Sequence, residues 1–185
     1  MHIYHDFLPY RVTEKPAIFA IGTFDGVHRG HKKLFSHLIE RAKTNRYASV
    51  LCVFLNHPQN CIDGEGTVSV LTSEDEKLSK IKEFPFDYIL ALRFKKEIRG
   101  VSPECFVEKL MQMFPIQEWS MGRDMSFGKD KKGDIDFLLE RSRKYGYTLN
   151  LIDTEKCGEK NISSSYIRQL LVEKKYDDVH MCIEG

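Results

Sequence analysis

An apolar run at residues 17–21 is followed by a glycine-bearing turn and then by apolar residues at helical spacing. The run has the composition of a buried strand, and Leu34, Phe35 and Leu38 recur as they would on one face of a helix. Glycines between the two patterns mark a tight turn. A strand, a turn and a helix start therefore occupy about 25 residues, and this unit constrains the fold of the whole chain.

Two histidines, His28 and His31, stand three residues apart where the helix is expected to begin, so both can face one ligand. Gly30 between them has no side chain and lets a bulky anion approach the backbone. The first turn of a helix also offers free N–H groups and the positive end of the helix dipole. The stretch predicts a polyphosphate site, although it is neither a Walker loop nor a Gly-x-Gly-x-x-Gly turn.

Strand and helix patterns alternate along the rest of the chain. Strands are expected at 17–23, 48–55, 86–92, 117–121 and 148–153, and helices at 31–44, from 73, from 102, at 134–145 and at 162–173. Residues 1–16 can add a short edge strand, and 59–70 and 154–161 are expected to be loops. This alternation predicts an α/β fold: one domain over 1–185, with a doubly wound parallel sheet of five strands and helices on both faces.

Polar residues follow the predicted strands. Asn56 and His57 come after the second strand, Asp124 after the fourth, and Ser163 to Arg168 after the fifth. Because ligands of such sheets bind beyond the carboxyl ends of the strands, we expect these residues to share one site with the histidines.

Composition excludes several classes of protein. The 28 basic and 27 acidic residues give a formal charge of +1, so charge does not favour a nucleic-acid or membrane partner. No apolar run reaches the length of a membrane span, and the first residues do not resemble a secretory signal. The five cysteines are scattered and odd in number, which favours a reducing compartment; we expect a cytoplasmic protein.

Three serines, Ser163, Ser164 and Ser165, open the last predicted helix, and Arg168 follows one turn later. Serine at this position is often only a helix cap, and arginine in the first turns is often a solvated surface group. Together with free N–H groups, however, the hydroxyls and the guanidinium also form a second anion cradle. Both interpretations remain open from the residues alone.

The stretch Gly22 to His31 resembles the His-x-Gly-His motif of the nucleotidyltransferase superfamily, and its Gly-x-Phe-Asp-Gly flank resembles the FAD synthetase (FMN adenylyltransferase) branch. Ile162, Ser163, Ser164, Ile167 and Arg168 match the superfamily's Ile-Ser-Ser-x-x-Ile-Arg motif. Three further stretches resemble that branch: 54–58, 102–107, and 122–128 with 133–134. The resemblance implies a Rossmann-like nucleotidyltransferase fold.

The chain departs from the family pattern near the expected flavin site. Asn56 replaces a proline, Val53 a threonine and Met125 a phenylalanine. The residues alone also allow simpler roles, in which His57 ends a strand and Phe127 packs beside a turn. Bacterial members usually continue into a riboflavin kinase module, which we expect to be absent from this chain.

The resemblance implies transfer of AMP from ATP to FMN, giving FAD and pyrophosphate, with Mg²⁺ accompanying ATP and a separate riboflavin kinase as one partner. His28 and His31 would be catalytic. ATP would be bound by Gly22, Thr23, Phe24, Gly30, Ser163, Ser164 and Arg168, and FMN by Asn56, His57, Asp124 and Phe127. No metal ligand is assigned. The alternatives are another acceptor, nicotinate mononucleotide or phosphopantetheine, and a non-catalytic flavin- or nucleotide-binding regulator.

Overall fold

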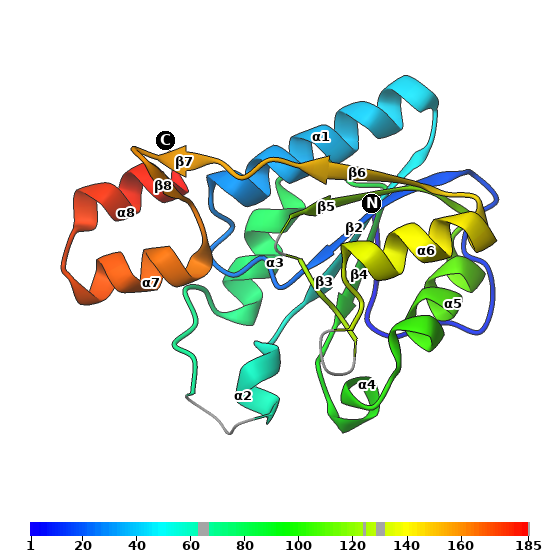
Figure 1. Ribbon diagram of the computed structural model, residues 1–185, viewed down its shortest axis with the longest axis horizontal. Coiled ribbons are helices and arrows are strands. Elements are labelled where there is room, and N and C mark those ends of the chain that lie inside the picture. The colour runs from blue at the N-terminus through cyan, green and yellow to red at the C-terminus, as the bar shows by residue number, and fades with distance from the viewer. Residues whose placement is uncertain (63–66, 124, 129–131, 185) are drawn as a thin grey trace.

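The computed structural model describes residues 1–62, 67–123, 125–128 and 132–184 (Figure 1). Its centre is a six-stranded sheet in the order β1-β4-β3-β2-β5-β6, in which each neighbouring pair is parallel. The strands are His2–Tyr4 (β1), Ala17–Gly22 (β2), Ala48–Phe54 (β3), Tyr88–Leu92 (β4), Ile116–Gly122 (β5) and Thr148–Ile152 (β6). The predicted α/β class is confirmed.

The predicted number of five strands is wrong, because the sheet has a sixth strand, β1, at its edge. This strand has three residues and pairs with β4, where Ile3 lies opposite Ile89. Three residues are too few to show a period, so only the tertiary pairing defines the strand. The expectation of a short edge strand in the lead-in is confirmed.

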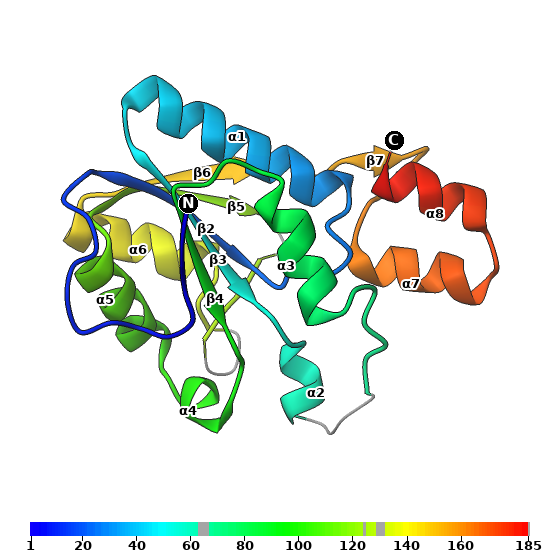
Figure 2. The ribbon, with the colours of Figure 1, turned by 180° about the vertical axis from the view of Figure 1, so that it is seen from behind.

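Helices cover both faces of the sheet. The four that pack on it are Arg29–Asn45 (α1), Glu74–Lys82 (α3), Pro103–Met113 (α5) and Ile135–Tyr145 (α6). Figure 1 shows α5 and α6 on one face, and Figure 2, from behind, shows α1 and α3 on the other. Successive residues of β2 supply the two cores, since Ile18 belongs to the same core as Leu38 of α1, and Phe19 belongs to the same core as Leu110 of α5. Such a strand is apolar on both sides, as the sequence predicted.

The helices predicted from 73, from 102 and at 134–145 each begin at a residue whose side chain caps the helix. Ser73 and Glu76 make a reciprocal capping box at the start of α3, and Ser102 accepts a hydrogen bond from the backbone of Cys105 at the start of α5. Asp134 caps α6, which ends at Gly146 in the left-handed conformation. These local signals needed no tertiary information.

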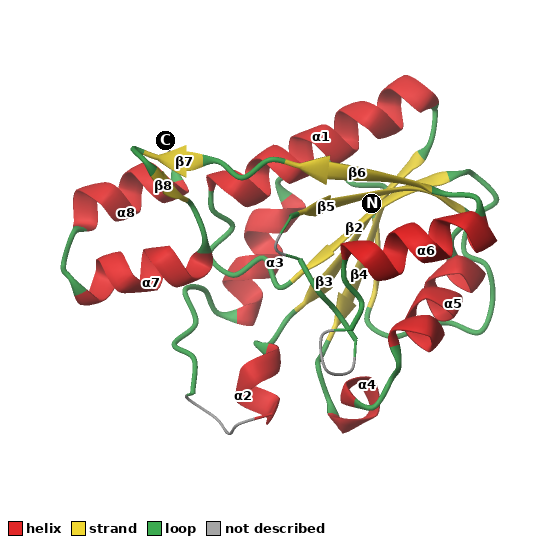
Figure 3. Cartoon of the chain, in the orientation of Figure 1, coloured by secondary structure: helices red, strands yellow, loops and turns green. Residues whose placement is uncertain are grey.

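Two loop predictions are wrong in part. Residues 58–62 form a short helix, Pro58–Ile62 (α2), and the 154–161 segment contains an antiparallel hairpin of Lys156–Cys157 (β7) and Lys160–Asn161 (β8). A further short helix, Lys96–Arg99 (α4), was not predicted. Figure 3 shows these short elements at the rim of the sheet. Elements of two to five residues carry too few positions for a periodic pattern.

The last two helices, Ser164–Val172 (α7) and Tyr176–Ile183 (α8), pack on each other beyond the carboxyl ends of the strands (Figures 1 and 2). Their small core contains Ile162, Ile167, Leu170 and Cys182. The order of strands reverses beside β2, because β3 lies on one side of it and β5 on the other. This switch point opens toward α7, and it is where a doubly wound sheet binds its ligand.

Among the described residues, no helix combines the length and the apolar character that crossing a membrane requires.

Candidate active site

A cleft of about 1090 Å³ lies at the carboxyl ends of the central strands. Predicted site residues from four separate stretches of sequence line it: Gly22, Thr23, Phe24, His28, Gly30, His31, His57, Phe127, Ser163, Ser164 and Arg168. The fold therefore brings to one cavity the two motifs predicted to bind phosphate, 22–31 and 162–168, which we call the first and second phosphate motifs. The individual roles of these residues remain predictions.

The two histidines stack on each other at the start of α1. Their ring centroids are 3.6 Å apart, and His28 is the N-cap residue with extended backbone angles. The His28 side chain makes no capping hydrogen bond, so the first N–H groups of the helix are left without a side-chain cap. The Nδ1 atoms of both rings also lack a hydrogen-bond partner among the described residues.

Both imidazoles are neutral near neutral pH. Burial lowers the pKa of His28 to about 4, although the Asp25 carboxylate partly opposes this effect. Burial also lowers the pKa of His31 well below its ordinary value, and the positive charge of Lys77 acts in the same direction. A neutral imidazole keeps one N–H donor, which can reach an anion in the cleft.

The turn before α1 has unusual backbone geometry. Phe24 and Val27 adopt positive φ angles of 47° and 43°, and Gly26 between them has φ 82°. A β-branched residue such as Val27 rarely adopts this conformation, so the turn is held by its surroundings. A side chain at Gly30 would approach the His28 ring to 3.3 Å, which explains the glycine in the His-x-Gly-His pattern.

Helix α7 supplies the second polar wall. Ser163 caps the helix by accepting a hydrogen bond from the backbone N–H of Tyr166 at 3.1 Å, so the capping interpretation of this serine is confirmed. Ser164 donates its hydroxyl to the backbone carbonyl of Asp25 at 2.9 Å. Ser163, Ser164 and Ser165 all line the cleft, as does Arg168.

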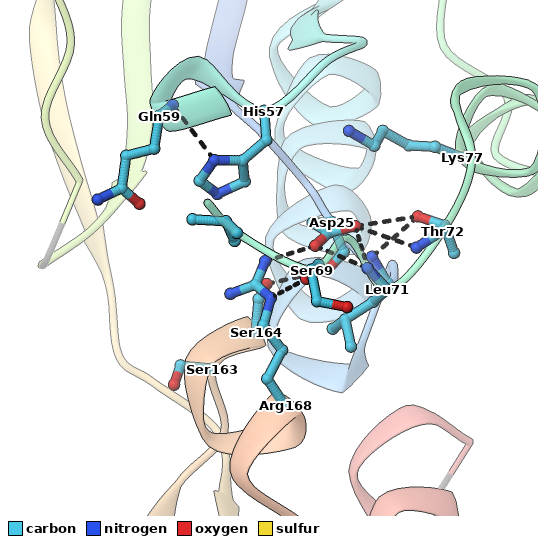
Figure 4. A network of polar contacts seen from close by, with 12 residues as sticks. Asp25, His57, Gln59, Ser69, Leu71, Thr72, Lys77, Ser163, Ser164 and Arg168 are labelled. Carbon is cyan, nitrogen blue, oxygen red and sulfur yellow. Dashed lines mark hydrogen bonds and ion pairs between the residues drawn. The ribbon is translucent and has the colours of Figure 1, made fainter. Parts of the chain in front are cut away.

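Asp25 connects the two phosphate motifs (Figure 4). Its carboxylate is 1% exposed and forms an ion pair with Arg168 at 2.6 Å. The same carboxylate accepts hydrogen bonds from the backbone N–H groups of Leu71 and Thr72. Sequence analysis did not identify this role, which depends on contacts across more than 140 positions of the chain.

We call the cleft surface formed by His28, His31, Ser163, Ser164 and Arg168 the polar half. A second set of lining residues, which we call the apolar half, consists of Phe54, Phe94, Met125 and Phe127. Phe54 and Phe94 make an edge contact with ring centroids 5.7 Å apart, and Phe127 packs on Phe106. A flat aromatic ring system would find large apolar contacts on this side.

Of the four residues predicted to bind the flavin, two are lining residues of the cleft. His57 and Phe127 line the cleft. Asn56 is not a lining residue, because its amide donates to the Phe94 carbonyl at 3.0 Å and accepts from the Phe94 N–H at 2.7 Å. Asn56 thus joins the ends of β3 and β4. Asp124 lies outside the described residues.

A buried lysine, which sequence analysis missed, supports this edge of the sheet. Lys77 of α3 is 2% exposed, and its ammonium donates to the carbonyls of Phe54 and Leu55 at 3.0 and 2.8 Å. Burial lowers the pKa of Lys77, and the Asp25 carboxylate opposes that shift. The spacing of Lys77 to Ile81 could have revealed it, because four residues place both on the same buried helix face.

No group of three or more histidine, cysteine, aspartate or glutamate side chains in the described part of the chain is arranged to hold a metal ion. Asp25 does not fit a metal ligand, since both of its carboxylate oxygens already accept hydrogen bonds. Magnesium that accompanies a nucleotide is usually held through phosphate oxygens and waters, with few carboxylate ligands.

The fold resembles that of a protein of known structure. A crystal structure described as a macrolide-efflux protein from Streptococcus pneumoniae matches 92% of this chain and 57% of its own, with a TM-score of 0.74. The two sequences are 22% identical, so this match supports the fold alone.

The curated relatives carry the name bifunctional riboflavin kinase/FMN adenylyltransferase. One from Buchnera aphidicola subsp. Schizaphis graminum is 33% identical over 162 residues, covering 85% of this chain and 51% of the relative. One from Escherichia coli K12 is 28% identical, covering 86% and 51%. The chain thus spans about half the length of these relatives.

The model of the FAD synthetase family matches residues 11–166, which include the first phosphate motif, the beginning of the second as far as Tyr166, and the segments that line the apolar half. This chain belongs to the FAD synthetase family.

Proposed function

We propose that this chain transfers the AMP group of ATP to the phosphate of FMN, forming FAD and releasing pyrophosphate. The observation that carries the proposal is the meeting of His28, His31 and Arg168 at one cleft, in a chain that belongs to the FAD synthetase family. The cleft also has an apolar wall suited to a flavin ring. The relatives of this chain carry FMN adenylyltransferase in their names.

In this reaction a phosphate oxygen of FMN attacks the α-phosphorus of ATP. The bond from that phosphorus to the oxygen bridging the α- and β-phosphates breaks, and this oxygen leaves with pyrophosphate. The attacking oxygen is already anionic, so the site needs no general base. Catalysis then depends on positioning the two substrates and on stabilising the charge that moves to the leaving pyrophosphate.

The neutral rings of His28 and His31 donate hydrogen bonds to the α- and β-phosphate oxygens in this proposal. Their unpartnered Nδ1 atoms and their place at the start of α1 support that role. Because the donors are preorganised in a buried site, they stabilise developing charge without reorganising during the reaction.

The β- and γ-phosphates are held by the first turn of α7 and by Arg168. Ser163 and Ser164 line the cleft, although their hydroxyls also make hydrogen bonds within the protein. The free N–H groups of the helix start and the guanidinium favour a multiply charged anion. Residues of the turn, Gly22, Thr23 and Phe24, complete the ATP side. Magnesium, carried by the phosphates, neutralises part of their charge.

FMN occupies the apolar half in this proposal, with its ring system against Phe54, Phe94 and Phe127. Asn56 supports this surface through its two hydrogen bonds to Phe94 rather than by facing the cleft. A riboflavin kinase, the other activity in the names of the relatives, is the class of enzyme that supplies FMN.

The test is incubation of the purified chain with ATP, FMN and magnesium, followed by chromatography of the flavins and measurement of pyrophosphate. We expect FAD and pyrophosphate in equal amounts. Parallel reactions contain nicotinate mononucleotide or phosphopantetheine in place of FMN. A dinucleotide formed only with one of these acceptors would assign another substrate, and FMN binding without pyrophosphate release would assign a binding regulator.

A further inference from the structure

The buried carboxylate of Asp25 lies where three distant segments meet. These are the turn between β2 and α1, the segment 69–72, and the start of α7 (Figure 4). Leu71 and Thr72 each donate a backbone N–H to the carboxylate, at 3.0 and 3.1 Å. The Thr72 hydroxyl lies 3.3 Å from the carboxylate and 3.1 Å from the N–H of Gly26. One side chain therefore fastens the segment 69–72 to the turn.

The same carboxylate fixes the orientation of a guanidinium. Arg168 donates one terminal nitrogen to Asp25 at 2.6 Å and its Nε to the carbonyl of Ser69 at 2.5 Å. Two bonds in different directions fix the plane of the guanidinium. The second terminal nitrogen makes no hydrogen bond to any described residue, and Arg168 lines the cleft.

Helix α7 is also fastened through its first residue. Ser164 donates its hydroxyl to the backbone carbonyl of Asp25 at 2.9 Å. Asp25 thus bonds to the first turn of α7 through its own backbone carbonyl and to Arg168 through its own carboxylate. Helix α7 packs mainly on α8, and these polar bonds tie it to the first phosphate motif.

We propose that Asp25 is a positioning residue for ATP, which holds Arg168 and the start of α7 facing the phosphate end of the cleft. The inference rests on the proposed function and extends it to a residue that touches neither substrate. It requires a charged carboxylate, because an amide at this place would turn an N–H donor toward Arg168 or a backbone N–H.

The decisive variant is Asp25→Asn, which keeps the size of the side chain and removes its charge. We expect the KM for ATP to rise about 10-fold or more, on the scale of a lost charge-assisted hydrogen bond. The KM for FMN should stay within about twofold, because the apolar half does not contact Asp25. The matched control is Glu173→Gln, which removes the charge of a carboxylate at the C-terminal end of α7. It should leave the KM for ATP and the KM for FMN unchanged.

A double-variant cycle tests whether Asp25 acts through Arg168. If it does, Asp25→Asn combined with Arg168→Ala should have an ATP KM within about threefold of Arg168→Ala alone. Independent, multiplying effects of the two substitutions would overturn the inference. So would a folded Asp25→Asn variant with an unchanged KM for ATP, or with equal changes in both constants.

Asp25→Asn could fail to fold, as shown by circular dichroism, and Arg168→Lys then serves as the test. Lysine keeps the positive charge but cannot bond Ser69 and Asp25 in the fixed geometry of a guanidinium. We expect the KM for ATP to rise about 10-fold here too. An ATP KM equal to that of the unchanged protein would show that fixing the guanidinium is irrelevant.

The experiments distinguish failure of the positioning role of Asp25 from failure of the proposed function. If the unchanged protein forms FAD and the variants bind ATP normally, the inference fails and the function stands. If the unchanged protein forms no FAD, the same variants are compared by calorimetric titration with ATP and magnesium. A loss of ATP affinity confined to Asp25→Asn and Arg168→Lys would then still support the positioning role.

Discussion

The polar and apolar halves of the cleft are built in different ways. The polar half consists of two helix starts joined by the Asp25 network, in which hydrogen bonds and an ion pair hold Ser164 and Arg168 in place. The apolar half consists of aromatic side chains on strand ends and short segments, among them Phe54, Phe94 and Phe127. Directional hydrogen bonds make one half sensitive to single atoms, whereas the other depends on shape and area.

The largest expected effect lies in the polar half. His31→Ala should lower kcat for FAD formation by about 10²-fold to 10³-fold, the scale of losing one donor to a charge that develops in the transition state. The measurement is the rate of FAD formation at saturating substrates. His37→Ala, on the same helix but away from the cleft, is the control. A folded His31→Ala variant with near-normal turnover would contradict the proposal that His31 stabilises the transition state.

The second prediction concerns the pH dependence of stability that His28, in the polar half, confers on the protein. The pKa of His28 is lowered from 6.5 to about 4 in the folded protein, so below pH 6.5 the unfolded chain binds more protons at this residue. Stability should therefore fall as the pH drops from 6.5 toward 4, by on the order of 2–3 kcal/mol from His28.

Urea unfolding at pH 7 and pH 4.5 measures this loss. The variant His28→Gln should show a smaller decrease between the two pH values, whereas His180→Gln should behave as the unchanged protein. An identical decrease in all three proteins would mean that burial of His28 does not control the stability in this range.

The third prediction concerns the guanidinium. Arg168→Ala should raise the KM for ATP about 10-fold or more and leave the KM for FMN nearly unchanged. It should also lower the free energy of unfolding, because the buried Asp25 carboxylate loses its ion-pair partner. Arg11→Ala, which breaks an exposed pair with Glu14, is the control. An unchanged KM for ATP would show that Arg168 does not take part in binding the nucleotide.

The fourth prediction concerns the support of the apolar half. Asn56→Ala removes the two hydrogen bonds to the Phe94 backbone and should destabilise the protein by about 1–3 kcal/mol. Because Asn56 does not line the cleft, the KM for FMN should change less than the stability. Chemical unfolding and FMN kinetics check the two parts. A large change in the KM for FMN at unchanged stability would favour direct contact with the flavin.

The smallest effect is expected within the apolar surface itself. Met125→Phe restores the aromatic residue of the family pattern at a half-buried position that lines the cleft. We expect the KM for FMN to fall about twofold to fivefold, on the scale of one additional aromatic contact, while the KM for ATP is unchanged. Tighter ATP binding would show that the two halves are coupled.

Local signals in the sequence predicted much of the fold. The capping residues Ser73, Ser102 and Asp134 and the apolar run 17–21 depend on neighbours a few residues away, so they can be read without a structure. The short helices α2 and α4 were not predicted, because elements of four or five residues are stabilised by contacts outside their own few residues.

The sequence by itself determined which chemical groups belong to the candidate site: two histidines at a helix start, a second helix start with serines, and Arg168 one turn later. Phosphate recognition needs these residue types at fixed spacing, and spacing within a helix is a local property. The tertiary structure alone decided which groups face the cleft. It turned Asn56 toward Phe94 and made Asp25 the link between distant segments, because hydrogen-bond partners far apart in sequence are chosen only when the chain packs.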